Sequence, residues 1–178
     1  KINLLFFGHI RKSKGIKELY KLINGIEDTN VQQAINLVIV GSDTNQCIDR
    51  FVLRISNKVS LNKLLRKVSD SEMQSAYSYA DYVMLPYLSI SQSGVLESAI
   101  SYRKPVLASD LPFFKKYLSQ YPSFGVQFNV NDQQSFNNLI DNFVDGNKEY
   151  YLDEDLKKYM NNQIFEEFSY NFTTHFLG

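Results

Sequence analysis

The stretch that decides the fold is residues 82–110, YVMLPYLSISQSGVLESAISYRKPVLASD. The apolar run Tyr82–Pro86 predicts a strand, and residues 89–93 form a small polar loop that leads into a predicted helix. A second apolar strand is predicted at Pro105–Ser109. A polar loop between the carboxyl end of a strand and the start of a helix leaves backbone N–H groups free to bind an anion.

The predicted helix also carries a side chain that suits a nucleotide ligand. Glu97 stands near its start, and an ionised carboxylate only accepts hydrogen bonds, which fits ligand hydroxyls. In an open α/β sheet, ligands bind at the carboxyl ends of the strands. An anion site beside a hydroxyl acceptor therefore predicts a nucleotide or nucleotide sugar as the ligand.

The rest of the chain continues the alternation of strands and helices. Apolar runs predict further strands at Ile2–Phe7, Leu37–Val40, Val59–Leu65 and Gly125–Phe128. Apolar periodicity and polar caps predict helices at Ile16–Ile26, Asn45–Ile55 and residues 69–80, 93–102, 113–118 and 132–144. This order predicts a Rossmann-like, doubly wound parallel sheet flanked by helices. The tail from about Asn147 is predicted to be helical and to pack across the domain edge.

Composition restricts the class of protein. The 178 residues fit one domain, residues 1–178, which would bury roughly 70% of its unfolded surface. Nineteen basic and nineteen acidic residues cancel, so no whole-chain field attracts nucleic acid or an anionic membrane. No apolar run approaches the ~20 residues of a membrane span. The single Cys47 favours a reducing compartment, and the start at Lys1, directly on a strand, indicates an excised piece of a larger protein.

The loop after the first predicted strand, GHIRKSKG, is basic. Gly8 and Gly15 allow tight backbone turns there. Arg11 offers a fork to paired phosphate oxygens, and Lys14 offers a point charge. The loop lacks the glycines of a dinucleotide-binding fingerprint or a P-loop. Taken by itself, it fits a solvated basic loop better than a phosphate site.

The basic loop and the deciding stretch together match a known pattern. Residues 6–15, FFGHIRKSKG, contain G-x-x-x-x-x-K-G after a strand. Residues 69–109 contain S-D-x-E-x-x-x-x-Y-x-x-A-D-x-x-x-L-P, then Leu96-Glu97 and Pro105-Val106. The chain resembles the carboxyl-terminal, donor-binding domain of retaining GT-B glycosyltransferases of family 4, also called group 1. The resemblance implies one half of a GT-B fold, without the amino-terminal acceptor domain.

The resemblance implies roles for individual residues. Lys14 and Arg11 would hold the donor diphosphate from one side, and the amides of residues 93–95 would hold it from the other. Glu97 would bind the ribose hydroxyls, and the base would lie near residues 67–68. The implied donor-binding residues are Gly8, His9, Arg11, Lys14, Lys67, Val68, Ser89, Gln92, Ser93, Gly94, Val95 and Glu97. The implied catalytic residues are Arg11, Lys14 and Glu97.

The chain departs from the family pattern at two positions. His9 stands where the family usually has Arg, and Arg11 is expected to supply that charge. Ser89 stands where the first acid of the family's E-x7-E pair falls, which leaves the donor sugar and the extent of activity open. The acids Asp153-Glu154-Asp155 fit a helix amino terminus better than a metal site. No metal and no other cofactor is expected.

The implied function is transfer of a sugar from a nucleoside-diphosphate sugar to a glycan or lipid-linked acceptor, with retention. The chain would be the donor-binding half, inactive alone, of a cytoplasmic enzyme of polysaccharide biosynthesis. The full enzyme would associate peripherally with the cytoplasmic face of the inner membrane, and nucleic acid is not expected as a partner. Two alternatives stay open. A nucleotide-sugar epimerase of GT-B fold should carry extra acids and a His in the cleft loops, and a non-catalytic α/β interaction module would fit the Ser89 and His9 departures.

Overall fold

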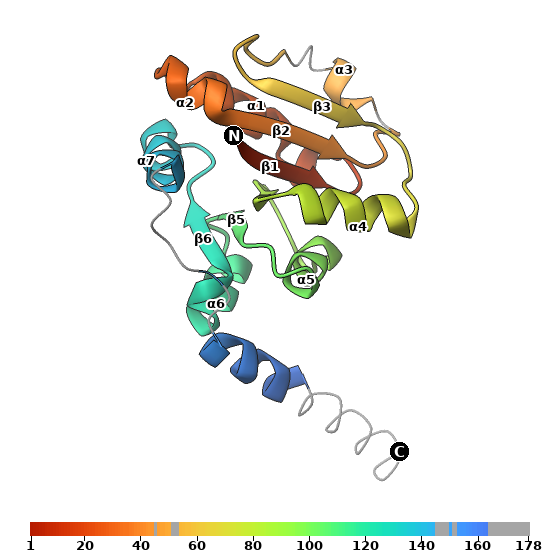
Figure 1. Cartoon of the computed structure of the whole chain (residues 1–178), viewed down its shortest axis with the longest axis vertical. Helices are drawn as coiled ribbons and strands as arrows, with labels where there is room; N and C mark the ends of the chain where they lie inside the picture. Colours follow the sequence, from red (N-terminus) through yellow and green to blue (C-terminus); the bar gives the residue numbers. More distant parts are fainter. Residues whose placement is uncertain (45, 51–53, 145–149, 151–152, 164–178) are drawn as a thin grey trace.

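The computed structural model describes residues 1–44, 46–50, 54–144, 150 and 153–163. An all-parallel six-stranded sheet lies between two layers of helices (Figure 1). Its strands are β1 (Ile2–Phe7), β2 (Ile35–Val40), β3 (Ser60–Leu64), β4 (Tyr82–Leu85), β5 (Val106–Ser109) and β6 (Gly125–Phe128). The spatial order is β3-β2-β1-β4-β5-β6, which is the order of a doubly wound sheet. The predicted fold class is confirmed.

Each face of the sheet has its own hydrophobic core, because parallel strands covered by helices are apolar on both sides. In β1, Leu4 and Phe6 belong to one core and Leu5 to the other. The first core includes side chains of α1 (Ile16–Asn24), α2 (Thr29–Ala34), α3 (Cys47–Arg50) and α7 (Gln133–Val144). The second includes side chains of α4 (Asp70–Tyr79), α5 (Gly94–Ser101) and α6 (Pro112–Gln120). Two short 3-10 helices, η1 (Lys12–Lys14) and η2 (Pro122–Phe124), lie in connections.

The predicted helix start at Ser69 is confirmed. The Ser69 hydroxyl accepts a hydrogen bond from the backbone N–H of Glu72, and the Glu72 carboxylate accepts one from the Ser69 N–H at 2.9 Å. Two N–H groups at the amino end of α4 are thus satisfied reciprocally. Arg66 donates to the same carboxylate, and this bond, with the one from Ser69, lowers the pKa of Glu72 to about 2.

The predicted helix over residues 45–55 is wrong at its carboxyl end. α3 is described over Cys47–Arg50, and residues 54 and 55 are not helical. Residues 45 and 51–53 lie outside the described part. The Asn24 side chain, at the end of α1, donates to the Arg54 carbonyl oxygen and accepts from the Ser56 N–H, both at 2.8 Å. Because these tertiary bonds use the backbone at residues 54–56, the helix does not extend through them.

The short helix α2 is absent from the predictions. Its sequence, TNVQQA, has too few apolar residues to show a helical period. Asp28 caps it by accepting from the Asn30 N–H at 2.7 Å. Gln32 is buried and donates to the Ile26 carbonyl oxygen at 2.6 Å. The helix is therefore fixed by its cap and by tertiary hydrogen bonds.

Residues 153–163 form a helix that packs near α6 (Figure 1). The Asp155 carboxylate accepts from the Ser123 N–H at 2.7 Å, and the Lys158 ammonium donates to the Gln120 carbonyl oxygen at 3.1 Å. Tyr159 packs against the second core. The other residues of the predicted tail, except Tyr150, lie outside the described part. Among the described helices, none has the length and apolar character needed to cross a membrane.

Candidate functional site

The loops after β1 and β4 meet at the middle of the sheet. β1 and β4 are neighbours, but β1 connects to β2 on one side, whereas β4 connects to β5 on the other. This is the topological switch point, where doubly wound sheets bind ligands at the carboxyl ends of their strands. The basic loop, residues 8–15, lies at this edge, and so does the connection of residues 86–93, which contains the polar loop and is here called the β4 loop.

Backbone contacts hold the two loops against each other. The Ser13 carbonyl oxygen accepts from the Leu88 N–H at 2.9 Å. Gly15 has φ 68°, and a Cβ atom there would lie 1.7 Å from the Pro86 carbonyl oxygen. Only glycine allows both this conformation and this approach. The position of the basic loop is therefore fixed by the backbone of the β4 loop.

Lys14 is held above an aromatic ring of the β4 loop. Its ammonium nitrogen lies 3.7 Å from the centre of the Tyr87 ring, within the range of a cation–π contact. Partial burial, followed by the neighbouring charge of Arg11, lowers the pKa of Lys14. Tyr87 is itself buried, and this burial raises its pKa to about 12. The ammonium group is thus oriented and partly stripped of water, with a second cation beside it.

The start of α5 lies close to the end of β1. Gly8 has φ 108°, and a Cβ atom there would lie 3.1 Å from the Val95 side chain. The buried hydroxyl of Ser93 caps α5 by accepting from the Leu96 N–H at 3.1 Å. The first N–H groups of a helix lack partners within the helix and carry partial positive charge. The amino end of α5 is therefore placed next to the basic loop.

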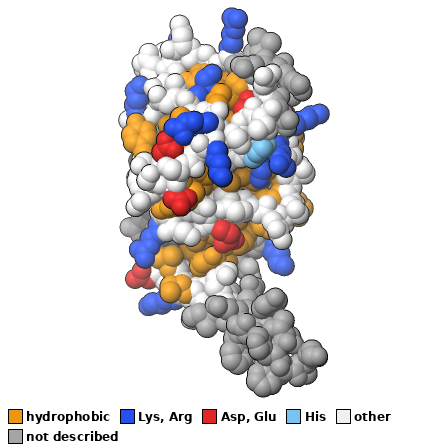
Figure 2. Space-filling model, turned by 90° about the vertical axis from the view of Figure 1, so that its right-hand side faces the viewer, with side chains coloured by type: hydrophobic (Ala, Val, Ile, Leu, Met, Phe, Trp, Pro, Cys, Tyr) orange, Lys and Arg blue, Asp and Glu red, His pale blue; other side chains and the backbone are white. Residues whose placement is uncertain are grey.

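Together these elements enclose a cavity of about 390 Å³, here called the cation pocket. It is lined by Phe7, His9, Arg11, Ser13, Lys14, Gly94, Val95 and Ser98. Five of the predicted donor-binding residues are thus brought together: His9, Arg11, Lys14, Gly94 and Val95. Figure 2 shows several basic side chains on one face of the molecule, with acidic ones scattered rather than gathered. The arrangement of cations and helix amides in the cation pocket is suited to a polyanion such as a diphosphate.

His9 is oriented by the loop after β2. Its Nδ1 atom lies 3.0 Å from the Ser42 hydroxyl oxygen, and its Nε2 atom lies 3.2 Å from the Thr44 hydroxyl oxygen. Both ring nitrogens are therefore within hydrogen-bond distance of a hydroxyl group. His9 thus lines the cation pocket with a ring that neighbouring side chains hold in place.

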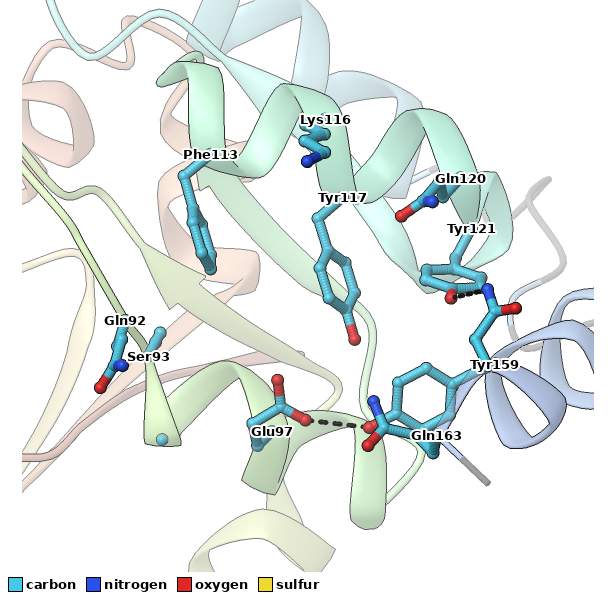
Figure 3. A pocket seen from close by; sticks show the side chains of 12 residues that line it. Gln92, Ser93, Glu97, Phe113, Lys116, Tyr117, Gln120, Tyr121, Tyr159 and Gln163 are labelled. Carbon is cyan, nitrogen blue, oxygen red and sulfur yellow. Dashed lines mark hydrogen bonds between the residues drawn. The ribbon is translucent and has the colours of Figure 1, made fainter. Parts of the chain in front are cut away.

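The structure does not bring Glu97 into the cation pocket. Successive helical residues point about 100° apart, and Ser98, one position later, lines the cation pocket instead. Glu97 faces a second cavity, of about 760 Å³, between α5, α6 and the helix of residues 153–163 (Figure 3). Its carboxylate accepts a hydrogen bond from the Tyr159 hydroxyl at 2.9 Å.

This second cavity is here called the aromatic pocket. It is lined by Gln92, Ser93, Gly94, Glu97, Phe113, Lys116, Tyr117, Gln120, Tyr121, Tyr159, Asn162 and Gln163. Three predicted donor-binding residues, Gln92, Ser93 and Glu97, line it without lining the cation pocket. Gly94 lines both cavities, so the two are adjacent at the start of α5.

The remaining predicted residues lie outside both lining sets. Lys67 is exposed, and Val68 is partly buried against the second core. Ser89 is exposed on the β4 loop. Sequence reasoning missed Ser98 as a cation-pocket residue. Its spacing of three residues from Val95, which places both on one face of a helix, was the available signal.

Solved structures of glycosyltransferases share this fold. The carboxyl-terminal domain of the glycosyl transferase group 1 family protein LpcC from Francisella tularensis has a TM-score of 0.60 and 17% identity, covering 82% of this chain and 76% of that chain. A structure described as trehalose-6-phosphate from E. coli bound with UDP-2-fluoro glucose has a TM-score of 0.64 and 11% identity, covering 80% of this chain and 36% of that chain. At such identities the likeness establishes the fold.

Sequence comparison adds a relative and a family. GDP-mannose:glycolipid 4-beta-D-mannosyltransferase from Xanthomonas campestris pv. campestris is 30% identical over 106 residues. The match covers 59% of this chain and 29% of that protein, so the chain spans less than a third of its relative. The sequence model described as Glycosyl transferases group 1 matches residues 1–163. The chain therefore belongs to the group 1 family of glycosyl transferases.

Proposed function

We propose that this chain binds the nucleoside-diphosphate sugar for a glycosyltransferase of the group 1 family. The observation that carries the proposal is the cation pocket, in which Arg11 and Lys14 lie in the same cavity as Gly94 and Val95 of α5. The Xanthomonas relative has GDP-mannose in its name, and the E. coli structure is described with a UDP sugar. Both compounds contain a nucleoside diphosphate, which is the group that this pocket suits.

The chemistry follows from the charge of the leaving group. Negative charge builds on the diphosphate as its bond to the sugar breaks. Arg11, Lys14 and the first amides of α5 would stabilise that charge from fixed positions. The proposal includes no metal and no other cofactor. Of Asp153-Glu154-Asp155, Asp155 accepts from the Ser123 N–H, and the described residues contain no group of three His, Cys, Asp or Glu side chains placed to hold a metal ion.

The finer parts of the donor site stay predictions. The ribose contact of Glu97 would require its carboxylate to exchange the Tyr159 hydroxyl for ligand hydroxyls. The base contact at residues 67–68 and the sugar contact at Ser89 would lie on exposed or partly exposed segments. Ser98, whose hydroxyl donates to the Gly94 carbonyl oxygen at 2.8 Å, joins the proposed diphosphate site.

The proposal for the whole protein goes further. A second domain would bind a glycan or lipid-linked acceptor, and transfer would retain the anomeric configuration of the donor. The setting would be polysaccharide biosynthesis in the cytoplasm, with peripheral attachment at the inner membrane. The NMR coupling of the product's anomeric proton, compared with that of the donor, checks retention. An inverted product would remove retention from the proposal and leave donor binding standing.

Titration calorimetry tests donor binding by this chain. We expect GDP or UDP to bind in the presence of EDTA, and we expect no transfer of sugar to any acceptor by the chain alone. If EDTA abolished binding, the proposal that the nucleotide binds without a metal would be contradicted. If the chain alone transferred sugar, the proposal that it is only the donor-binding half of the enzyme would be contradicted. An interaction module would bind neither nucleotide. An epimerase should carry extra acids and a His in the cleft loops; His9 lines the cation pocket, but no carboxylate does.

Diphosphate affinity should depend on the pH at which Lys14 loses its charge. Burial and Arg11 lower the pKa of Lys14 from the ordinary value of 10.5, so the folded chain loses this proton at a lower pH than a solvent-exposed lysine does. The charged form attracts the phosphates, and affinity should therefore fall as pH rises through the lowered pKa. Calorimetry across alkaline pH measures this fall. A Lys14→Ala variant should lack it, and an identical pH profile in that variant would contradict the assignment.

A further inference from the structure

The helix of residues 153–163, here called the tail helix, is weakly attached to the rest of the domain. None of its residues is buried: Asp155, Leu156, Tyr159 and a few others near them touch the domain, and most of the helix is exposed. Two of its charged side chains form hydrogen bonds with the backbone of α6 and η2. Elements with few buried apolar contacts open at low free-energy cost. The tail helix can therefore leave its place while both cores of the sheet stay packed.

Tyr159 connects the tail helix to Glu97. Its hydroxyl donates to the Oε2 atom of Glu97 at 2.9 Å (Figure 3). Its ring packs edge-on against Tyr121 and Phe124, with ring centres 5.5 and 5.6 Å away, and this packing fixes the direction of the hydroxyl. Burial, followed by the hydrogen bond to Glu97, raises the pKa of Tyr159 to about 12. Tyr159 thus keeps, at neutral pH, the proton that this bond needs.

Tyr117 extends this contact into a series of hydrogen bonds. Its hydroxyl is hydrogen-bonded to the Tyr159 hydroxyl, and Tyr117 is the donor because the Tyr159 proton is given to Glu97. Burial, followed by the charge of Glu97, raises the pKa of Tyr117, so this proton is also retained. Hydrogen bonds in series polarise and strengthen one another. The Glu97 carboxylate is thus held by two tyrosines, one from α6 and one from the tail helix.

The same carboxylate is the predicted acceptor for the ribose hydroxyls of the donor. Two vicinal hydroxyls need free acceptor positions on a carboxylate, and the Oε2 atom of Glu97 already accepts from Tyr159. Tyr159 also lines the aromatic pocket together with Glu97, so its ring takes up space beside the carboxylate. A ribose that binds Glu97 through both hydroxyls would therefore replace the Tyr159 hydroxyl.

We propose that the tail helix is a latch: Tyr159 occupies Glu97 in the free chain, and the ribose of a bound nucleotide displaces Tyr159 and releases the helix. The inference rests on the proposed function, in particular on the ribose contact of Glu97. Nucleotide binding and release of the helix are linked equilibria. A change that weakens the latch therefore strengthens nucleotide binding, and nucleotide binding in turn loosens the helix. A ligand without a ribose leaves the latch closed.

Titration calorimetry with Tyr159→Phe tests the latch, because this change removes the hydroxyl and keeps the ring. We expect GDP or UDP to bind the variant about three- to tenfold more tightly than the wild type, the range for losing one competing hydrogen bond. Inorganic pyrophosphate, which has no ribose, should bind both proteins alike. Tyr79→Phe is the matched control, because Tyr79 lies on α4, is 57% exposed and does not line the aromatic pocket. Thermal melting of each variant verifies that it is folded.

Hydrogen exchange of the wild-type chain gives a second readout. GDP or UDP should speed the exchange of the backbone amides of residues 153–163, and pyrophosphate should not. The latch is overturned if the nucleotide slows this exchange, if Tyr159→Phe binds the nucleotide no more tightly than the wild type, or if the affinity for pyrophosphate rises as much. In each of these cases the nucleotide still binds, and the proposed function stands. Absence of nucleotide binding by both proteins would instead contradict the proposed function, and the latch with it.

Discussion

Gly15→Ala is expected to lower the free energy of unfolding by about 2–5 kcal/mol, the sum of a left-handed backbone penalty and a close contact in a packed site. Gly15 has φ 68°, and a Cβ atom would lie 1.7 Å from the Pro86 carbonyl oxygen. A backbone oxygen cannot rotate away as a side chain can. The two loops that form the cation pocket would therefore have to separate, and diphosphate binding should weaken with them.

Thermal unfolding measures this effect, and the melting temperature should fall by roughly 4–20 °C for a domain of this size. Gly94→Ala is the matched control, since nothing lies within 4 Å of a Cβ atom built at Gly94. The free energy of unfolding of the control should equal that of the wild type or exceed it by up to about 1 kcal/mol. Its melting temperature should therefore not fall. Equal stability of both variants would show that the loops are not packed as the structure has them.

Lys14→Ala is expected to weaken nucleoside-diphosphate binding roughly ten- to a hundredfold, the range for losing one charge-assisted contact. The ammonium group is held over the Tyr87 ring in the cation pocket. Because we propose that it contacts the phosphates and not the base, the parent nucleoside should bind the variant and the wild type alike. The comparison of diphosphate affinity with nucleoside affinity therefore isolates the effect of the Lys14 charge on phosphate binding.

Lys12→Ala is the matched control for Lys14→Ala. Lys12 lies in the same loop but is exposed and absent from the lining of the cation pocket. Its removal changes the net charge by the same amount, so it measures the general electrostatic effect. Equal losses in the two variants would mean that overall charge, and not the position of Lys14, determines affinity. Equal losses of diphosphate and nucleoside would assign Lys14 to folding or to the base.

The sheet could be predicted from sequence because its signals are local. β1 and β6 have the predicted bounds, since short apolar runs between polar or turn residues suffice to mark buried parallel strands. The meeting of the basic and polar loops also follows, because the carboxyl ends of neighbouring parallel strands lie at one edge. Of the implied site, His9, Arg11, Lys14, Gly94 and Val95 share a cavity for this reason.

The direction of single side chains could not be predicted in the same way. A motif fixes the position of a residue along the chain, but on α5 one position changes the direction by about 100°. This step places Ser98 in the cation pocket and Glu97 in the aromatic pocket. Tyr117 and Tyr159 were missed because they are 42 residues apart in sequence and come together only because the helix of residues 153–163 packs near α6. No local pattern carries that information.

The most direct test of the account is calorimetric titration of GDP and UDP into the chain in the presence of EDTA, repeated with Lys14→Ala and Lys12→Ala. The account predicts that at least one nucleotide binds the wild type and Lys12→Ala with similar affinity, and binds Lys14→Ala at least tenfold more weakly. Absence of binding by a folded wild-type chain, or equal binding by Lys14→Ala, would contradict a diphosphate site in the cation pocket.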